Sequence, residues 1–268
     1  MKVEAERGYL IIAQNNSTTD YVKCARMLAH SIRAVEPTAK ICLLTDQLIE
    51  DSLFDFVKVF PFGDQAADSE WKLKNDWQCF YASPFRETIK LEADMIIPQS
   101  IKHWFDICSA QELVVTTGAR NFHNLLSESR FYRKIFDQNN LPDVYNAVTY
   151  WRLGRTASEF FETVKHIFNN WNEVMSALKF GTDQTLNTDL AYAIAVSMLG
   201  EEKCTLPGSV PGMIHMKGRF NGLQSEDWTK ELVWELNPGS LRINTIEQLW
   251  PFHYHVKEFA HHLEEYYG

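Results

Sequence analysis

Apolar runs and helical stripes alternate along the first fifty residues. The run Tyr9–Ala13 is apolar and is followed by polar residues 14–19, the pattern of a buried strand that ends in a loop. Apolar residues then recur at helical spacing from Cys24 to Val35 until Pro37, with Thr19 or Asp20 as the N-cap. A second apolar run, Ile41–Leu44, completes a strand–helix–strand order. This order predicts a parallel sheet that binds ligands at the carboxyl ends of its strands.

The rest of the chain continues the alternation. The pattern predicts strands over residues 54–60, 88–91, 95–97, 113–115, 144–151 and 213–216, and helices over 71–81, 156–178 and from 183 onward. A capping box, Thr156 to Glu159, precedes the longest stripe. No linker divides the chain, so we expect one α/β domain, a mostly parallel sheet flanked by helices. We divide it into a core over residues 1–218 and a C-terminal extension over 219–268 that packs on the core and is rich in Trp and His.

The composition mainly excludes classes of protein. The chain has 268 residues, 45% of them hydrophobic and 23% charged, which is typical of a globular protein. It has no apolar run of membrane length and no signal-peptide layout, so we expect a soluble protein in the cytoplasm. The five cysteines form no Cys-X-X-Cys pair, which favours buried free thiols. The net charge of −9 gives no general attraction to polyanions.

Several common catalytic signatures are absent from the sequence. There is no glycine-rich dinucleotide motif after the first strand, no P-loop, no His-Glu-X-X-His and no Gly-X-Ser-X-Gly. These absences disfavour dinucleotide oxidoreductases, P-loop kinases, zincin proteases and serine hydrolases.

The segment Glu92-Ala93-Asp94 interrupts an otherwise apolar strand. Two carboxylates one residue apart project to the same side of a strand and can hold a hard divalent cation through oxygen. The alternative is a pair of solvated acids at a strand edge.

The strand–helix–strand order is followed by the acid pair, a predicted strand that contains Asn146, Asp183-Gln184 at a predicted helix start, and the segment His215–Gly218. This order resembles the GT-A nucleotide-sugar glycosyltransferases, closest to the glycogenin and galactosyltransferase group known as family eight. In that family a strand ends in Asp-X-Asp, whose acids hold manganese against the diphosphate of a UDP-sugar. The resemblance implies a Mn²⁺ (or Mg²⁺) site made by Glu92 and Asp94, with His215 of the segment His215–Gly218 as the third ligand. It also places Lys217 and Gly218 beside the diphosphate. A purely structural role for His215 is the alternative.

The same resemblance implies the remaining donor-site residues. The segment that contains Asn146 faces the sugar or acceptor, Asp183 binds sugar hydroxyls, and Gln184 lies near the reacting carbon. Asp183 has the alternative role of a helix N-cap. The uracil end is implied to comprise Ala13, Gln14, Asn15 and Tyr21, although the family's acid is missing there. Lys72 or Lys74 is implied to approach a phosphate, with an exposed lysine on a helix as the alternative.

Residues 83–88 are also similar to glycosyltransferases encoded by tailed phages, some of which modify hydroxymethylated cytosine in DNA. If a phage encodes this protein, we expect it in the host cytoplasm. Residues 116–136 carry four basic residues against Glu128, so the local charge is 4 − 1 = +3. This stretch would border the acceptor, and a solvated helical face is the alternative. Its basic residues are Arg120, Arg130, Arg133 and Lys134. Separately, His253 and His255 could share a strand face, but no neighbouring acid completes a second metal site.

The resemblance therefore implies a metal-dependent, retaining glycosyltransferase that moves a hexose or pentose from UDP to an acceptor hydroxyl. One alternative is the same chemistry on hydroxymethylcytosine DNA. Another is a nucleotide-sugar-binding protein that has lost catalysis, and a third is a structural or interaction protein on the same scaffold.

Overall fold

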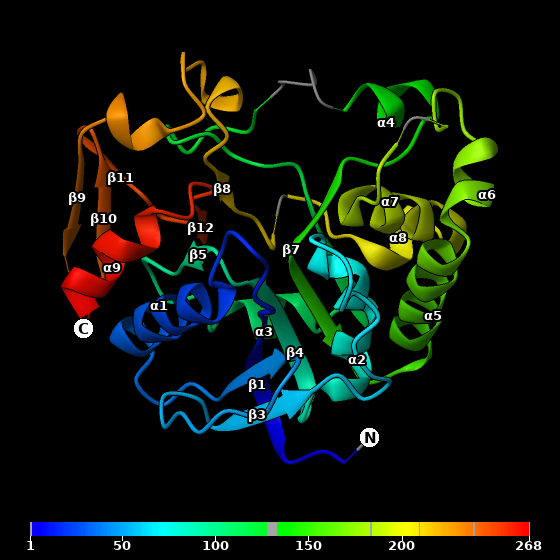
Figure 1. Ribbon diagram of the computed structural model, residues 1–268, viewed down its shortest axis with the longest axis horizontal. Helices are drawn as coiled ribbons and strands as arrows, with labels where there is room; N and C mark the ends of the chain where they lie inside the picture. The colour runs from blue at the N-terminus through cyan, green and yellow to red at the C-terminus, as the bar shows by residue number, and fades with distance from the viewer. Residues whose placement is uncertain (1, 128–132, 183, 209, 238, 268) are drawn as a thin grey trace.

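The computed structural model describes residues 2–127, 133–182, 184–208, 210–237 and 239–267, and its centre is a six-stranded sheet of order β3-β2-β1-β4-β7-β6 (Figure 1). The first four strands in this order run parallel, and β7 is antiparallel to both β4 and β6. This confirms the α/β class and the mostly parallel sheet. The strands are β1 Ala5–Ile12, β2 Ile41–Thr45, β3 Phe56–Val59, β4 Phe85–Glu92, β6 Leu113–Thr117 and β7 Val144–Arg152.

Each face of the sheet has its own hydrophobic core. Because side chains alternate along a strand, Tyr9 and Ile11 belong to one core and Leu10 and Ile12 to the other. Helices cover both faces, as Figure 1 shows. The first core includes residues of α1 (Tyr21–Val35), α3 (Trp104–Cys108) and α9 (Phe259–Tyr267), and the second those of α2 (Cys79–Ala82), α5 (Arg155–Asn169) and α7 (Thr188–Leu199).

The first helix forms where the sequence predicts it. The Asp20 side chain accepts a hydrogen bond from the Lys23 backbone N–H at 2.9 Å, which caps α1, and the helix ends two residues before Pro37. The segment predicted as a helix over 71–81 is instead a 3₁₀ helix, η1 (Lys72–Gln78), that continues into α2.

The later helices depart from the predicted pattern. The long stripe divides into α5 and α6 (Trp171–Ser176) at Asn170. The expected capping box does not cap α5, because the side chain of Glu112 accepts the Thr156 N–H at 2.8 Å instead. The next helix, α7, begins at Thr188 rather than at 183, and its cap is Asn187, which accepts the Leu190 N–H at 3.1 Å.

The C-terminal residues share a sheet with the core. Strand β12 (Phe252–His253) lies between β5 (Met95–Ile96), to which it is antiparallel, and β8 (Ile214–His215), to which it is parallel. Residues after β12 therefore reach the end of β4. The other elements are α4 Lys134–Gln138, α8 Glu201–Cys204, η2 Arg219–Asn221, η3 Trp228–Lys230, and the small sheet of β9 Trp234–Asn237, β10 Ser240–Ile243 and β11 Ile246–Glu247.

All five cysteines are buried and free, as predicted. Among the helices of the described residues, none has the length and apolar character needed to cross a membrane.

Candidate active site

A cavity of about 550 Å³ opens at the carboxyl ends of β1 and β4. This is the edge at which a parallel sheet binds its ligands. Its lining comes from the end of β1, the start of α1, residues 70–73, the end of β4, β7, the start of α7, the segment after β8, and β12 with the residues that follow it. Representative lining residues are Gln14, Tyr21, Glu92, Asp94, Asn146, Asp189, Lys217, His253 and Lys257.

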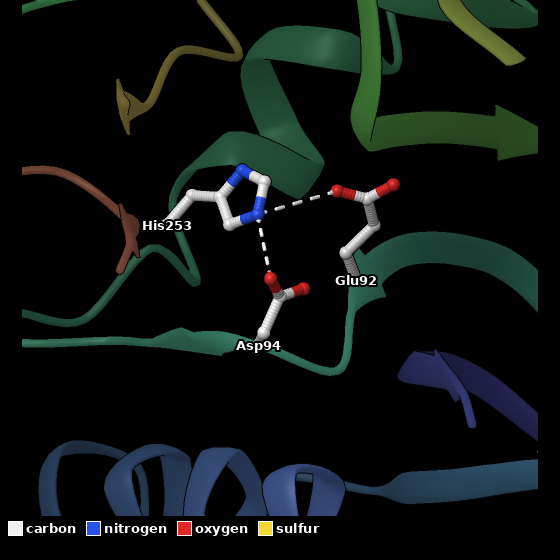
Figure 2. A group of neighbouring side chains, drawn as sticks. All are labelled: Glu92, Asp94 and His253. Atoms are coloured by element: carbon white, nitrogen blue, oxygen red, sulfur yellow. Dashed lines mark hydrogen bonds and ion pairs between the residues drawn. The ribbon is translucent and has the colours of Figure 1, made fainter. Parts of the chain in front are cut away.

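Glu92, Asp94 and His253 form a group that fits a metal ion (Figure 2). Their ligand atoms all lie within 4.8 Å of one another. His253 Nε2 lies 2.8 Å from Asp94 Oδ2 and 3.8 Å from Glu92 Oε2. Two carboxylates and an imidazole are a donor set that suits Mn²⁺. The Lys257 ammonium also contacts Asp94, so this position accommodates a positive charge.

The electrostatics of the group keep Asp94 ionised. Burial works to raise the pKa of Asp94, but the charges of His253 and Lys257 outweigh it and hold that pKa well below its usual value. Burial works against the charged form of Lys257, yet Asp94 raises the pKa of Lys257 to about 12. Burial also raises the pKa of Glu92. The site therefore combines one firmly charged carboxylate with one that a cation would help to ionise.

His215, the predicted third ligand, lies directly behind His253. The two residues are paired in register on β8 and β12, and their ring centroids are 5.1 Å apart. His215 is buried, and burial holds its pKa well below the usual value. His253 is thus the histidine that directly faces both acids. The sequence carried a signal for it in the pattern His253-X-His255, but the missing acids lie about 160 residues earlier, in Glu92 and Asp94.

Lys217 and Lys72, which the family resemblance implies for the diphosphate, both line the cavity. Burial lowers the pKa of Lys217. The Lys72 ammonium donates to the carbonyls of Ala66 and Ala67 at 2.9 and 3.2 Å. Gly218 has a packing role, because a Cβ there would lie 1.9 Å from the Ser225 carbonyl oxygen.

At the predicted base end, Ala13, Gln14 and Tyr21 line the cavity. Gln14 Nε2 donates to Asp64 at 2.5 Å, and Gln14 Oε1 accepts from Asn75 at 2.9 Å. Asp64, from a loop about 50 residues further along the chain, therefore contacts the amide of Gln14. Asn15 instead accepts the Val22 N–H at 2.9 Å, at the start of α1.

Asn146 and Asp189 lie together in the cavity wall beside Glu92. The side-chain amide of Asn146 donates to Glu92 at 2.8 Å, and its backbone N–H donates to Asp189 at the same distance. Sequence reasoning missed Asp189, which lies six positions after Asp183 in the sequence. Asp183 lies outside the described residues. Gln184 lines a second hollow of about 640 Å³ beside Trp171, rather than this cavity.

Burial removes Arg133 from the basic patch that the sequence predicts beside the acceptor. Arg133 is 1% exposed and pairs with Asp189 at 2.8 Å, so it does not present its charge to an acceptor. A buried guanidinium requires such a partner because the uncompensated charge would be costly. The Arg120 guanidinium lies 4.3 Å from the ring centroid of Trp250. Lys134 is exposed, and Arg130 lies outside the described residues.

Comparison with known proteins identifies the fold. No protein-family model and no curated protein sequence matches the chain. The structure is similar to that of the galactosyltransferase LgtC, solved with donor and acceptor sugar analogs, with a TM-score of 0.57, 10% identity, and coverage of 97% of this chain and 95% of that one. Mouse xyloside xylosyltransferase 1 matches with a TM-score of 0.45, 12% identity and coverage of 75% and 85%. From the match to LgtC, the chain has the GT-A fold of glycosyltransferases.

Proposed function

We propose that this protein is a metal-dependent, retaining glycosyltransferase that transfers a sugar from a UDP-sugar to an acceptor hydroxyl. The observation that carries the proposal is the group Glu92, Asp94 and His253 at the end of β4, inside a cavity of a GT-A fold. The cavity volume of about 550 Å³ lies in the range of about 300–1,000 Å³ that is typical of small-molecule sites.

Mn²⁺ or Mg²⁺ would be held by Glu92, Asp94 and His253, with His215 packed behind His253. When bound, the ion neutralises charge that develops on the leaving diphosphate. Oxygen and imidazole ligands suit this role, and the site already accepts the Lys257 ammonium.

Two lysines support binding of the diphosphate. Lys217 and Lys257 both line the cavity on the side of the metal group. A preorganised cation in a partly desolvated site stabilises a developing anion more than an exposed one does. Both lysines would therefore favour the departure of UDP from the sugar as the leaving group.

At the sugar end, the proposal assigns donor hydroxyls to Asn146 and Asp189, which line the cavity beside Glu92. Asp183 and Gln184 keep the sugar-binding role that the family resemblance implies. Gln184 lies beside Trp171, so it has to turn toward the cavity to reach the reacting carbon.

The test is hydrolysis and transfer assayed over a panel of UDP-sugars, with Mn²⁺ or with a chelator. We expect turnover only with the metal, and a loss of at least about a hundredfold in Asp94→Asn and His253→Ala, since each removes a ligand. His103→Ala, an exposed histidine outside the cavity, is the matched control. Undiminished turnover of the Asp94 variant would contradict the proposal. Tight UDP binding without turnover would instead identify an inactive binding protein.

The acceptor is tested separately, with hydroxymethylcytosine DNA among the candidates. A sugar-sized gain in mass on the nucleoside would identify DNA as the acceptor. No gain with any donor would discard that alternative.

A further inference from the structure

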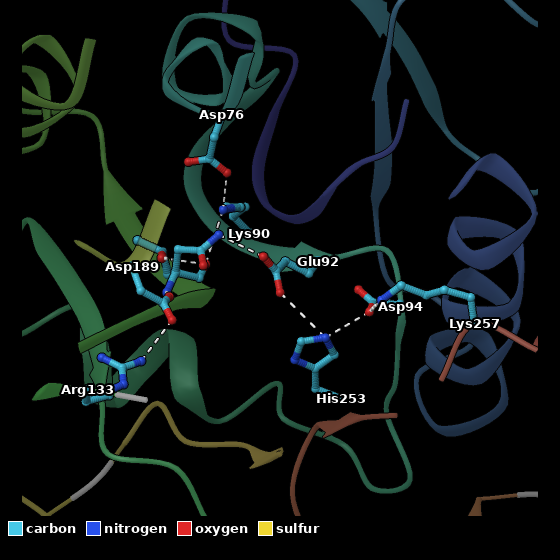
Figure 3. Close-up of polar contacts among 10 residues, drawn as sticks. Asp76, Lys90, Glu92, Asp94, Arg133, Asp189, His253 and Lys257 are labelled. Carbon is cyan, nitrogen blue, oxygen red and sulfur yellow. Dashed lines mark hydrogen bonds and ion pairs between the residues drawn. The ribbon is translucent and has the colours of Figure 1, made fainter. Parts of the chain in front are cut away.

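Two ion pairs hold the two backbone polar groups of one residue, Asn146, next to the proposed metal site. Lys90 pairs with Asp76, and Arg133 pairs with Asp189 (Figure 3). The side chains of Lys90 and Asp76 have no exposed surface. That of Arg133 is 1% exposed, and that of Asp189, which lines the cavity, is 25% exposed. Burying charges is costly even when they are paired, so an arrangement of this kind invites a functional explanation.

The first pair holds the carbonyl group of Asn146. Lys90 Nζ donates to the Asn146 carbonyl oxygen at 3.1 Å while it also contacts Asp76. The hydroxyl of Tyr192 donates to the other oxygen of Asp76 at 2.5 Å. Both carboxylate oxygens of Asp76 are therefore engaged, and the ammonium is directed at the peptide.

The second pair holds the N–H group of Asn146. Asp189 Oδ1 accepts this N–H at 2.8 Å, and Asp189 Oδ2 accepts from Arg133 at 2.8 Å. Arg133 is itself fixed by a bond to the Val144 carbonyl at 2.8 Å and by the ring of Tyr145, 3.6 Å from the guanidinium carbon. The Lys90 ammonium thus binds the Asn146 carbonyl oxygen, and the Asp189 carboxylate binds the Asn146 N–H.

The side chain of Asn146 connects this fixed backbone to the metal group. Its Nδ2 donates to Glu92 Oε1 at 2.8 Å, whereas Glu92 Oε2 is the oxygen that faces His253 at 3.8 Å. Glutamate has one more rotatable bond than aspartate, and the hydrogen bond from Asn146 removes that freedom.

We propose that Asn146 is a positioning residue that presents Glu92 to the metal through Oε2 alone, and that the two ion pairs fix Asn146 for this purpose. This inference rests on the proposed function, because it concerns the same metal site. It explains how a glutamate serves where the family resemblance leads us to expect an aspartate.

The test measures Mn²⁺ affinity directly, from the electron paramagnetic resonance signal of the free ion. Asn146→Ala should weaken Mn²⁺ binding by at least about tenfold, the effect typical of residues that orient a metal ligand. Asn237→Ala, at an exposed asparagine on β9, is the matched control and should leave the affinity unchanged. Asn146→Ser and Arg133→Lys, which disturb the same arrangement more mildly, replace Asn146→Ala if that variant does not fold, and each should give a smaller loss.

A double-mutant comparison separates positioning from general damage. If Asn146 acts through Glu92, the change Asn146→Ala should have no further effect on Mn²⁺ affinity once Glu92→Gln is present. Additive losses, or equal affinities in Asn146→Ala and wild type, would overturn the inference. Failure of the wild-type protein to bind Mn²⁺ at all would instead overturn the proposed function.

Discussion

His253 Nε2 lies 2.8 Å from Asp94 Oδ2, although the two residues are 159 positions apart in the chain. The contact follows from the pairing of β12 with β5, in which His253 is opposite Met95, the residue after Asp94. The backbone N–H of Tyr254 also donates to the Asp94 carbonyl at 3.2 Å. The C-terminal segment therefore completes the candidate metal site.

The first prediction distinguishes the two histidines. His253→Ala should lower Mn²⁺ affinity by at least about a hundredfold, because a direct ligand is lost, and His215→Ala by about tenfold, because only the support behind it is lost. Isothermal titration of Mn²⁺ into both variants measures the difference. A larger loss in His215→Ala would show that His215 is the ligand and that His253 has the supporting role.

A second prediction concerns Lys257, whose ammonium contacts Asp94. Lys257→Met removes a positive charge that competes with the metal, so without nucleotide the Mn²⁺ affinity should rise severalfold. The affinity for UDP should fall severalfold in the same variant, because a cation near the diphosphate is lost. Titrations with Mn²⁺ alone and with UDP alone measure the two effects. Lys230→Met, at an exposed lysine, is the control, and a change of both affinities in the same direction would contradict the prediction.

Asp64 provides a third prediction. Its bond to Gln14, together with that of Asn75, holds the Gln14 amide in one orientation at the base end of the cavity. Asp64→Ala should weaken UDP binding by about three- to tenfold, since about 1 kcal/mol is typical of one hydrogen bond. Mn²⁺ affinity should not change. Asp68→Ala in the same loop is exposed and serves as the control; equal UDP affinities in the two variants would refute the role of Asp64.

The fourth prediction is one of stability. Lys90→Met leaves the carboxylate of Asp76 buried without its cation, which typically costs about 3–5 kcal/mol in the free energy of unfolding. Lys58→Met breaks a more exposed pair with Glu4 and should cost much less, because solvent screens an exposed pair. Urea unfolding followed by circular dichroism compares them. Similar losses in both variants would show that burial does not increase the contribution of the Lys90–Asp76 pair to the free energy of unfolding.

Local patterns were sufficient for much of the fold. The alternation from Tyr9 to Leu44 predicted β1, α1 and β2, because a strand or helix that buries one face shows its period directly in the sequence. The break at Glu92-Ala93-Asp94 was visible for the same reason, since charges rarely interrupt a buried strand without a role. Where an element depended on a distant partner, prediction failed: Glu112 caps α5, and the predicted capping box does not.

In the candidate site too, the features that depend on neighbouring residues could be predicted, and those that depend on distant residues could not. The sequence by itself determined the parallel sheet, the position of the acid pair at the end of a strand and the burial of the cysteines, because each depends on neighbours in the chain. Only the tertiary structure decided that His253 faces the acids, that Asp189 lines the cavity and that Arg133 is buried in an ion pair. These relationships depend on strand pairing and packing between residues that are far apart in sequence, which leave no periodic trace along the chain.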